Sequence, residues 1–191
     1  MPAVLYSSGD APTRSHPETL LSVILRASSG DHAMAIVIAG ERVGKQGRLT
    51  VGCSASIFHR DRQKMLLTQR VDNGQWCVPG GFMEPGESMT EACAREVLEE
   101  TGLHTQVVRL IGVYTNPHLL LTYPDGNAWQ MVVLHFEAEP INGMLGTSDE
   151  TMASAYFARA EIDQLEMSRL DRLRVLDAFD SGTMTIVRDI F

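Results

Sequence analysis

The chain has 191 residues, of which 44% are hydrophobic and 21% are charged, so it can fill one globular core with at most an appended segment. Its formal net charge of −8 argues against binding along a nucleic-acid polymer or an anionic membrane surface, because both attract basic proteins. No apolar run is long enough for a transmembrane helix, and no signal peptide is recognisable. The three cysteines are odd in number and form no CxxC pair, which indicates free thiols in a cytoplasmic protein.

Residues 1–47 differ in character from the rest, and we expect them to form an extension in front of a main domain at 48–191. Residues 1–17 are rich in Ser, Pro and Gly and are predicted to be poorly ordered. Residues 18–27 fit a short helix or a strand equally well. Three roles stay open for the extension: an extra strand, a cover for the sheet edge, or a contact in a homodimer.

Runs of apolar and β-branched residues alternate with turn signals along the chain. They predict strands at 33–39, 49–58, 64–69, 106–114, 119–123, 128–138, 153–158 and 183–188. The polar stretch HRDRQ predicts a hairpin between the second and third of these, and the Tyr-Pro-Asp-Gly turn predicts a hairpin between the fifth and sixth. We expect loops at 40–47 and 141–146, and helical periodicity over 165–179.

The stretch from Gly80 to Leu103 reads GGFMEPGESMTEACAREVLEETGL and carries the strongest signal in the chain. Gly80 and Gly81 let the backbone turn or approach a ligand closely. Ser88 and Glu91 have the spacing of a capping box, and Gly102 suits the left-handed residue that ends a helix. The sequence therefore predicts a helix over 89–101.

Three carboxylates share one face of this helix. Glu96, Glu99 and Glu100 fall within an arc of roughly 100°, whereas Ala94, Val97, Leu98 and Thr101 lie opposite, on the face that we expect to be buried. Like charges on one stripe repel each other, and they stand near the helix C-terminus, where the dipole disfavours negative charge. A hard divalent cation removes this conflict, since Mg²⁺ and Mn²⁺ prefer oxygen ligands.

The spaced set of glycines, glutamates and Arg95 resembles the Nudix box, the signature of the Nudix (MutT-like) hydrolases, and every fixed position of that pattern is filled here. With the flanking strands, the resemblance extends over roughly residues 50–165. It implies an α/β fold of the Nudix type, an α/β/α sandwich with a mixed β-sheet. It also implies a metal-dependent hydrolase that cleaves the diphosphate linkage of a nucleoside diphosphate derivative.

The same resemblance assigns roles to residues of the box. Glu99 and Glu100 are implied metal ligands, and Glu96 is either a ligand or the base that takes a proton from water. Glu87 is implied to add a ligand or to hold a metal-bound water, and the carbonyl of Gly81 is a further implied ligand. Arg95 would orient a carboxylate. We expect the backbone around Gly80, Gly81 and Phe82 to contact the substrate, and we expect more than one Mg²⁺ in the presence of substrate.

Four residues outside the box are candidates with competing interpretations. Arg70 ends a strand beside the expected site and either clamps a phosphate or is a solvated strand-end residue. Glu150 lies in an acidic loop where many family members keep a catalytic or metal-linked glutamate, but it also fits a surface carboxylate. Tyr123 and Trp129 flank a predicted hairpin turn and either stack on a base or pack across the sheet.

The substrate stays open between ADP-ribose or a nucleotide sugar and a nucleoside triphosphate. Pro117 follows Leu103 by fourteen residues, near where ADP-ribose-type members carry a proline, although it also fits a strand terminator. A different class of function is a Nudix-fold sensor that binds a nucleotide without cleaving it. Such sensors usually have a degraded box, so the intact set of carboxylates favours catalysis.

Overall fold

The computed structural model describes residues 36–189 and, further upstream, the backbone of two short strands, β1 (Val4–Tyr6) and β2 (Val23–Ile24). Apart from these strands, the expected poor order of residues 1–17 and the helix-or-strand alternative for 18–27 lie outside the described residues.

Most of the chain from residue 36 onward forms strands, with two α-helices and two short 3₁₀ segments between them. The strands are β3 (Ile36–Ala39), β4 (Arg48–Ser56), β5 (Lys64–Arg70), β6 (Trp76–Cys77), β7 (Gly80–Phe82), β8 (Leu103–Thr115), β9 (Leu119–Thr122), β10 (Ala128–Gly143), β11 (Thr151–Ala158) and β12 (Thr185–Arg188). The helical segments are η1 (Val43–Gln46), α1 (Met89–Thr101), η2 (Arg159–Gln164) and α2 (Arg169–Asp180).

The strands form two sheets. The main sheet has nine strands in the order β1-β12-β8-β10-β9-β3-β2, and β4 joins it by pairing with β10 and β7. It is mixed: β10 and β4 run parallel, as do β8 and β12, whereas β10 pairs antiparallel with both β8 and β9. The second sheet is antiparallel, with the order β11-β5-β6.

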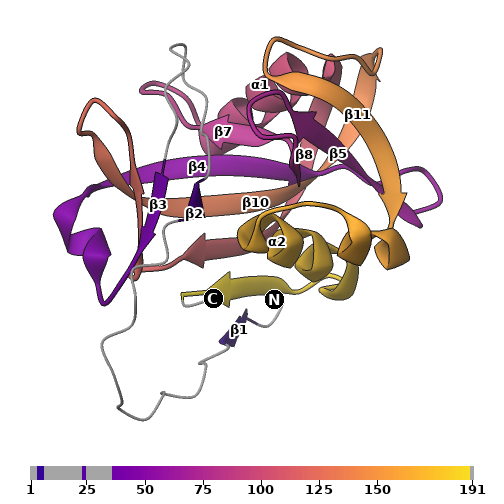
Figure 1. Ribbon diagram of the computed structural model, residues 1–191. Helices are drawn as coiled ribbons and strands as arrows, with labels where there is room; N and C mark the ends of the chain where they lie inside the picture. Colours follow the sequence, from indigo (N-terminus) through magenta and orange to yellow (C-terminus); the bar gives the residue numbers. More distant parts are fainter. Residues whose placement is uncertain (1–3, 7–22, 25–35, 190–191) are drawn as a thin grey trace.

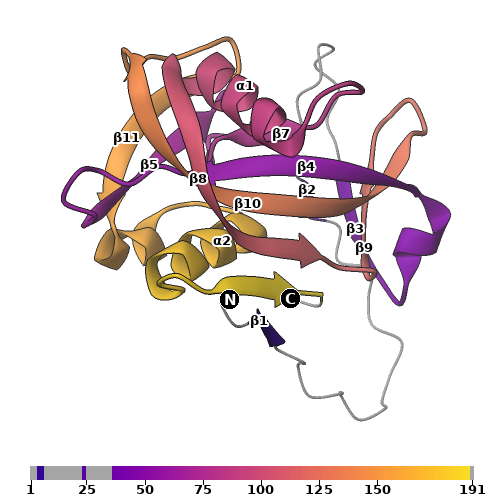
Figure 2. The same ribbon diagram turned by 180° about the vertical axis from the view of Figure 1, so that it is seen from behind.

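The two helices lie on opposite sides of the strands (Figures 1 and 2). Each helix covers its own hydrophobic core, and the side chains of β5 point alternately into one core and the other. Leu66 belongs to the core beneath α1, while Met65 and Leu67 belong to the core beneath α2, and all three are fully buried. The expected α/β fold, with a mixed sheet between two helices, is confirmed.

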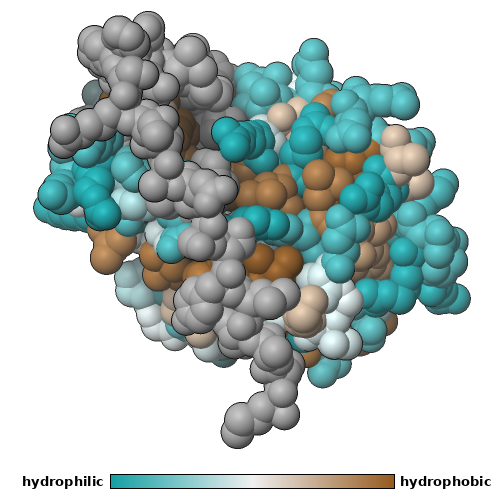
Figure 3. All heavy atoms as spheres, turned by 90° about the horizontal axis from the view of Figure 1, so that it is seen from below, coloured by the Kyte–Doolittle hydropathy of each residue, from teal (hydrophilic) through white to brown (hydrophobic). Residues whose placement is uncertain are grey.

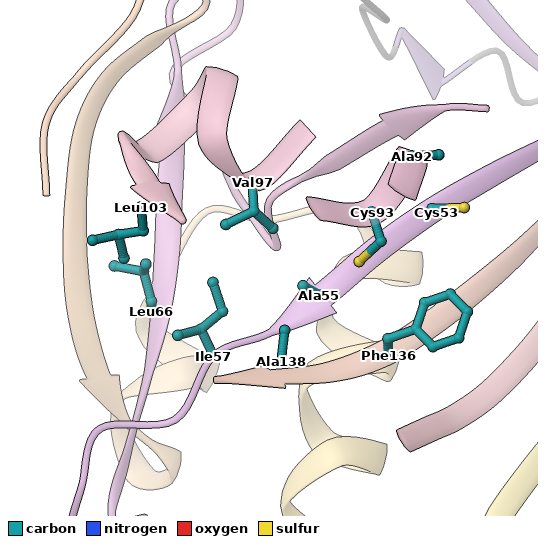
Figure 4. Close-up of a cluster of buried hydrophobic side chains, with 10 residues drawn as sticks. All are labelled: Cys53, Ala55, Ile57, Leu66, Ala92, Cys93, Val97, Leu103, Phe136 and Ala138. Atoms are coloured by element: carbon teal, nitrogen blue, oxygen red, sulfur yellow. The ribbon is translucent and has the colours of Figure 1, made fainter. Parts of the chain in front are cut away.

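The core beneath α1 is built from small and medium side chains of the helix and the sheet. Cys93 and Val97 of α1 pack toward Cys53 and Ala55 of β4 in Figure 4, and all four side chains are buried. Because the β4 residues beneath the helix, Cys53 and Ala55, have small side chains, the helix comes close to the strand. This close packing fixes the position of the acidic face of α1 relative to β7.

The predicted hairpin between residues 49–58 and 64–69 forms only near its turn. His59 N–H donates to the Lys64 carbonyl at 2.8 Å, and Leu66 N–H donates to the Ile57 carbonyl at 2.8 Å. Beyond this point β4 pairs with β10 and β5 pairs with β11, so the two strands separate into different sheets. Long-range pairing partners, which the local pattern does not reveal, decide this separation.

Three other predicted elements have different bounds in the structure. The predicted loop at 141–146 is partly strand, because β10 continues to Gly143 along β8. The glycines expected to form a turn instead form β7, which pairs with β4. The predicted helix at 165–179 begins only at Arg169, where Ser168 caps it by accepting the Asp171 N–H at 3.0 Å.

A buried polar layer lies on the α2 side of the main sheet. The imidazole of His135 lies 2.8 Å from the hydroxyls of both Ser54 and Ser56, and Arg174 of α2 donates to Ser54 at 2.9 Å. Burial, reinforced by the Arg174 charge, lowers the pKa of His135 well below its ordinary value, so the ring is neutral. Because Ser54 also pairs with Gly80, this layer supports the strand that carries the glycines.

The surface mixes polar and apolar residues, and the face seen in Figure 3 carries apolar residues among hydrophilic ones. Among the described residues, neither helix has the length and apolar character needed to cross a bilayer.

Candidate active site

The acidic helix forms as the sequence predicts. It spans Met89–Thr101, with Ser88 accepting the Glu91 N–H at 3.3 Å and Glu91 accepting the Ser88 N–H at 2.8 Å. Gly102 ends it with φ 74°, a left-handed conformation that glycine adopts without strain. The buried residues are Ala92, Cys93, Val97 and Thr101, so Ala94 and Leu98, which we expected on the buried face, are only half-buried. This rotation turns Glu96 and Glu100 toward β7.

Arg95 organises the acidic residues through all five of its N–H groups. Its Nε and Nη2 donate to Glu87 at 2.7 and 3.0 Å, and its Nη1 donates to Glu96 at 2.8 Å and to Glu99 at 3.2 Å. Nη2 also donates to the Phe82 carbonyl at 2.9 Å. The ion pair lowers the pKa of Glu87 to about 2, with help from the Glu84 N–H. Arg95 therefore links the glycine strand, the loop before α1 and the acidic face of α1.

Glu96 lies directly against Gly81. A β-carbon on Gly81 would stand 2.5 Å from the Glu96 carboxyl carbon, which is closer than any real contact, so the Glu96 position requires glycine here. Burial raises the pKa of Glu96 and outweighs the opposing effect of Arg95, with the charges of Glu99 and Glu150 adding to the rise. The carboxyl group of Glu96 is thus partly desolvated beside a backbone that no side chain shields.

Glu100 is the most buried carboxylate of the helix face. The N–H of Gly80 donates to its Oε2 at 3.3 Å, and the Thr68 hydroxyl donates to the same oxygen at 3.4 Å. Burial and the nearby charge of Glu96 raise the pKa of Glu100 to about 8, against the opposing effects of Gly80 and Arg70. A carboxylate held this way gains from any cation that reaches it, because both burial and like charge disfavour its ionised form.

Arg70 and Glu150 lie together beside the acidic face. Thr151 pairs with Arg70 across the β5–β11 ladder, and the Glu150 carbonyl accepts the Val71 N–H at 2.9 Å. Both charges act on Glu100, since Arg70 lowers its pKa and Glu150 raises it, after the larger effects of burial and Glu96. Arg70 also pairs with Asp72, with its Nε at 3.0 Å and its Nη2 at 2.8 Å from the two carboxylate oxygens.

Trp129 lies farther along the main sheet. It pairs with Arg48, four residues along β4 from Gly52, which pairs with Phe82. That offset is about 13 Å along a strand. The structure thus places Glu87, Arg95, Glu96, Glu99, Glu100, Gly80, Gly81, Phe82, Arg70 and Glu150 in one region and Trp129 at its periphery.

Thr68 is the contact that the sequence did not reveal. It is buried on β5 and donates to Glu100, although it lies 32 residues away in the chain. Its position two residues before Arg70, on a strand predicted to abut the site, is the one signal that would have found it.

The donor set suits a hard divalent cation. Glu96, Glu99, Glu100 and the Gly81 carbonyl supply only oxygen atoms, which Mg²⁺ and Mn²⁺ prefer. Within residues 36–189, however, no group of three His, Cys, Asp or Glu side chains is arranged to hold a metal ion as it stands. Arg95 accounts for this arrangement, because it draws Glu96 and Glu99 toward itself while Glu100 turns to Gly80. Glu99, whose side chain is 59% exposed, contacts Arg95 through one carboxylate oxygen only, at 3.2 Å.

The chain is similar in sequence to known nucleotide pyrophosphatases and phosphatases. An ADP-ribose pyrophosphatase from Methanocaldococcus jannaschii is 38% identical over 104 residues, which are 53% of this chain and 57% of that protein. The human 8-oxo-dGDP phosphatase NUDT18 is 33% identical over 156 residues, covering 75% of this chain and 44% of that protein. The matched regions are therefore about half the length of these two relatives.

A solved structure and a family model also match this chain. The crystal structure of a NUDIX hydrolase from Nitrosomonas europaea has a TM-score of 0.59 at 19% identity, covering 88% of this chain and 94% of that one, a likeness of fold. The family model described as the NUDIX domain matches residues 50–179, which include α1 and the whole acidic site. With the acidic face of α1, Arg95 and the glycines in the arrangement described above, the chain belongs to the Nudix hydrolase family.

Proposed function

We propose that this Nudix hydrolase is a divalent-metal-dependent pyrophosphohydrolase that cleaves the diphosphate linkage of a nucleoside diphosphate derivative. The observation that carries the proposal is the placement of Glu96 and Glu100 against the bare backbone of Gly80 and Gly81. Burial and mutual repulsion make these two carboxylates unfavourable for stability, whereas a bound cation would offset both effects.

Glu96, Glu99, Glu100, Glu87 and the Gly81 carbonyl would hold Mg²⁺ or Mn²⁺. When bound, such a cation neutralises phosphate oxygens, lowers the pKa of a water molecule and stabilises the leaving group. Arg95 holds the carboxylates in orientation, and Glu96 or Glu150 accepts the proton of the attacking water. Arg70 contacts a phosphate oxygen of the substrate. The backbone around Phe82 lines one side of the bound substrate, and Trp129 contacts its distal part.

ADP-ribose or another nucleotide sugar and a nucleoside triphosphate, including an oxidised one, are the candidate substrates. The two relatives are named for ADP-ribose and for 8-oxo-dGDP. Pro117 lies in the turn between β8 and β9, where its carbonyl accepts the Gly44 N–H at 3.0 Å. This position gives the proline a structural role and leaves the choice of substrate to experiment.

The test is a panel of nucleoside diphosphate derivatives and triphosphates assayed with Mg²⁺ and with Mn²⁺. Released phosphate is measured after coupling to a phosphatase. We expect turnover of at least one compound by the native protein, loss of turnover in Glu99→Gln, and native turnover in the matched control Glu139→Gln on the exposed part of β10. Binding of a nucleotide without turnover of any compound would contradict the proposal and favour a nucleotide sensor.

We also propose that the protein acts in the cytoplasm. Cys53, Cys77 and Cys93 are buried and make no disulfide, which suits a reducing compartment. A homodimer is part of this proposal and is considered next.

A further inference from the structure

Strand β11 is an edge strand with unusual composition. It pairs with β5 on one side, and among the described residues no strand pairs with its other side. Figures 1 and 2 both place β11 at the outer side of the molecule, with β5 on its inner side. Its eight residues, TMASAYFA, contain no charge and no proline, although exposed edges usually carry such residues to prevent association.

The hydrogen-bond pattern of β5 shows which groups of β11 are free. Three residues of β5 use backbone groups on the side away from β11. The Lys64 carbonyl accepts the His59 N–H, the Leu66 N–H donates to the Ile57 carbonyl, and the Arg70 N–H donates to the Gln75 carbonyl. Because alternate residues of a strand point their backbone groups in opposite directions, Met65, Leu67 and Gln69 bond toward β11. Their register partners are Phe157, Ala155 and Ala153.

The residues between them therefore direct their backbone groups outward. These are Ser154 and Tyr156, followed by Ala158, whose N–H is already taken by the Glu161 carboxylate at 2.7 Å. Exposure fits this pattern: Leu66 and Leu67 on β5 are fully buried, whereas the β11 residues opposite them are only half-buried. The outer edge of β11 thus presents the amide and carbonyl groups of Ser154 and Tyr156.

We propose that this edge pairs with the β11 edge of a second copy of the chain, antiparallel and with the dyad at Ala155. In this register Ser154 of each copy faces Tyr156 of the other, so the four outward groups on each copy satisfy one another. The alanines at 153, 155 and 158 leave room at the junction, and Met152, 50% exposed, packs opposite the partner's Ala158.

Charge at the strand ends favours an antiparallel over a parallel arrangement of two copies. An acidic segment, Ser148-Asp149-Glu150, precedes β11, and Arg159 follows it. Antiparallel pairing about Ala155 places Arg159, whose guanidinium is paired with Asp180 of its own chain at 2.8 and 3.0 Å, opposite the partner's Thr151. A parallel pair would set acidic ends together instead, so the sequence favours the antiparallel dimer.

The register gives a covalent test. At the dyad, Ala155 is a non-hydrogen-bonded pair with itself, with Cα atoms about 4.5 Å apart, within the range that a disulfide spans. The two copies of Ala153 would be about 13 Å apart, which is too far. Mild oxidation should therefore cross-link Ala155→Cys into a dimer and leave the control Ala153→Cys uncross-linked, while the native cysteines are buried.

The association itself is measured by analytical ultracentrifugation. The native chain of 21.0 kDa should sediment with twice that mass. Ser154→Pro removes an outward N–H without touching the β5 ladder and should sediment as a monomer, whereas Ser154→Ala, which keeps the N–H, should remain a dimer. Circular dichroism reports whether the proline variant is folded. If it is not, the comparison of Ala155→Cys with Ala153→Cys still tests the proposed interface.

Three results would overturn the proposal: a monomeric native protein at about 100 μM, well above the Kd of ordinary dimers; equal cross-linking of both cysteine variants; or a folded Ser154→Pro variant that remains dimeric. All three results are read without an activity assay, so failure of the interface and failure of the proposed activity can be told apart.

Discussion

Arg95 forms a bidentate ion pair with Glu87, in which Nε lies 2.7 Å from one carboxylate oxygen and Nη2 lies 3.0 Å from the other. The two residues lie eight positions apart, on the helix and on the loop before it, so this pair fixes the loop to the helix. The remaining N–H groups of Arg95 reach Glu96, Glu99 and Phe82. One side chain therefore sets the distance between the glycine strand and the acidic face.

Replacing Arg95 by lysine should reduce turnover by about 10- to 100-fold, because an ammonium group cannot form the two-pronged contact or reach all four partners. The thermal midpoint of the metal-free protein should also fall, since an ammonium group can bond fewer of the three carboxylates at once. Steady-state kinetics and differential scanning calorimetry measure the two effects. Native turnover in Arg95→Lys would show that a single positive charge is sufficient.

Gly81→Ala tests the contact between β7 and Glu96. The added β-carbon would meet the Glu96 carboxyl group at 2.5 Å, and the end of a flexible side chain can move away more easily than backbone can. We expect the fold to persist and turnover to fall by about 10- to 100-fold, because Glu96 is displaced. The matched control is Gly146→Ala, whose nearest neighbour would be 3.9 Å away and which should keep native turnover. Equal turnover in the two variants would show that the position of Glu96 does not matter for activity.

Glu100→Gln separates stability from catalysis. The amide keeps an oxygen for the Gly80 N–H but removes a carboxyl group whose ionisation is opposed by burial and by Glu96. We expect turnover to fall by roughly 10³-fold and the metal-free protein to unfold at a higher temperature. Added Mg²⁺ should raise the melting temperature of the native protein more than that of the variant. A variant that is both active and equally stabilised by Mg²⁺ would contradict the ligand role of Glu100.

The ion pairs of Glu137 predict that the fold loses stability in acid. Burial alone would raise its pKa, but ion pairs with Arg62 at 2.5 Å and Arg109 at 2.9 Å outweigh burial, so the pKa lies below its ordinary value of 4.5. A lowered pKa means that these pairs stabilise the fold above pH 4.5 and that the stabilisation disappears as the pH falls through the lowered pKa.

Urea unfolding of the native protein and of Glu137→Gln measures this contribution. At pH 7 the variant should be less stable by about 1–2 kcal/mol, because two arginines lose a charged partner. The difference should shrink as the pH falls below 4.5. A difference that is constant from pH 7 to pH 3 would assign the effect to packing instead of charge.

The acidic helix could be predicted from the sequence because its signals are local. Ser88, Glu91 and Gly102 set its ends, and the observed bounds are those predicted. The carboxylate face followed from a spacing of three and four residues. The prediction of the buried face was less accurate: Ala92 and Cys93 are buried, whereas Ala94 and Leu98 are only half-buried. Packing of the helix against β4 and β7 determines which of its residues are buried.

The sequence alone determined the family, the acidic helix and the chemistry of its donor atoms, because these depend on residue types at short spacing. Only the tertiary structure decided that β4 and β5 separate into two sheets, that Thr68 donates to Glu100, and that Arg70 and Glu150 lie beside the same carboxylate. These relationships join residues far apart in the chain, and their geometry depends on strand register and on burial, to which many distant side chains contribute.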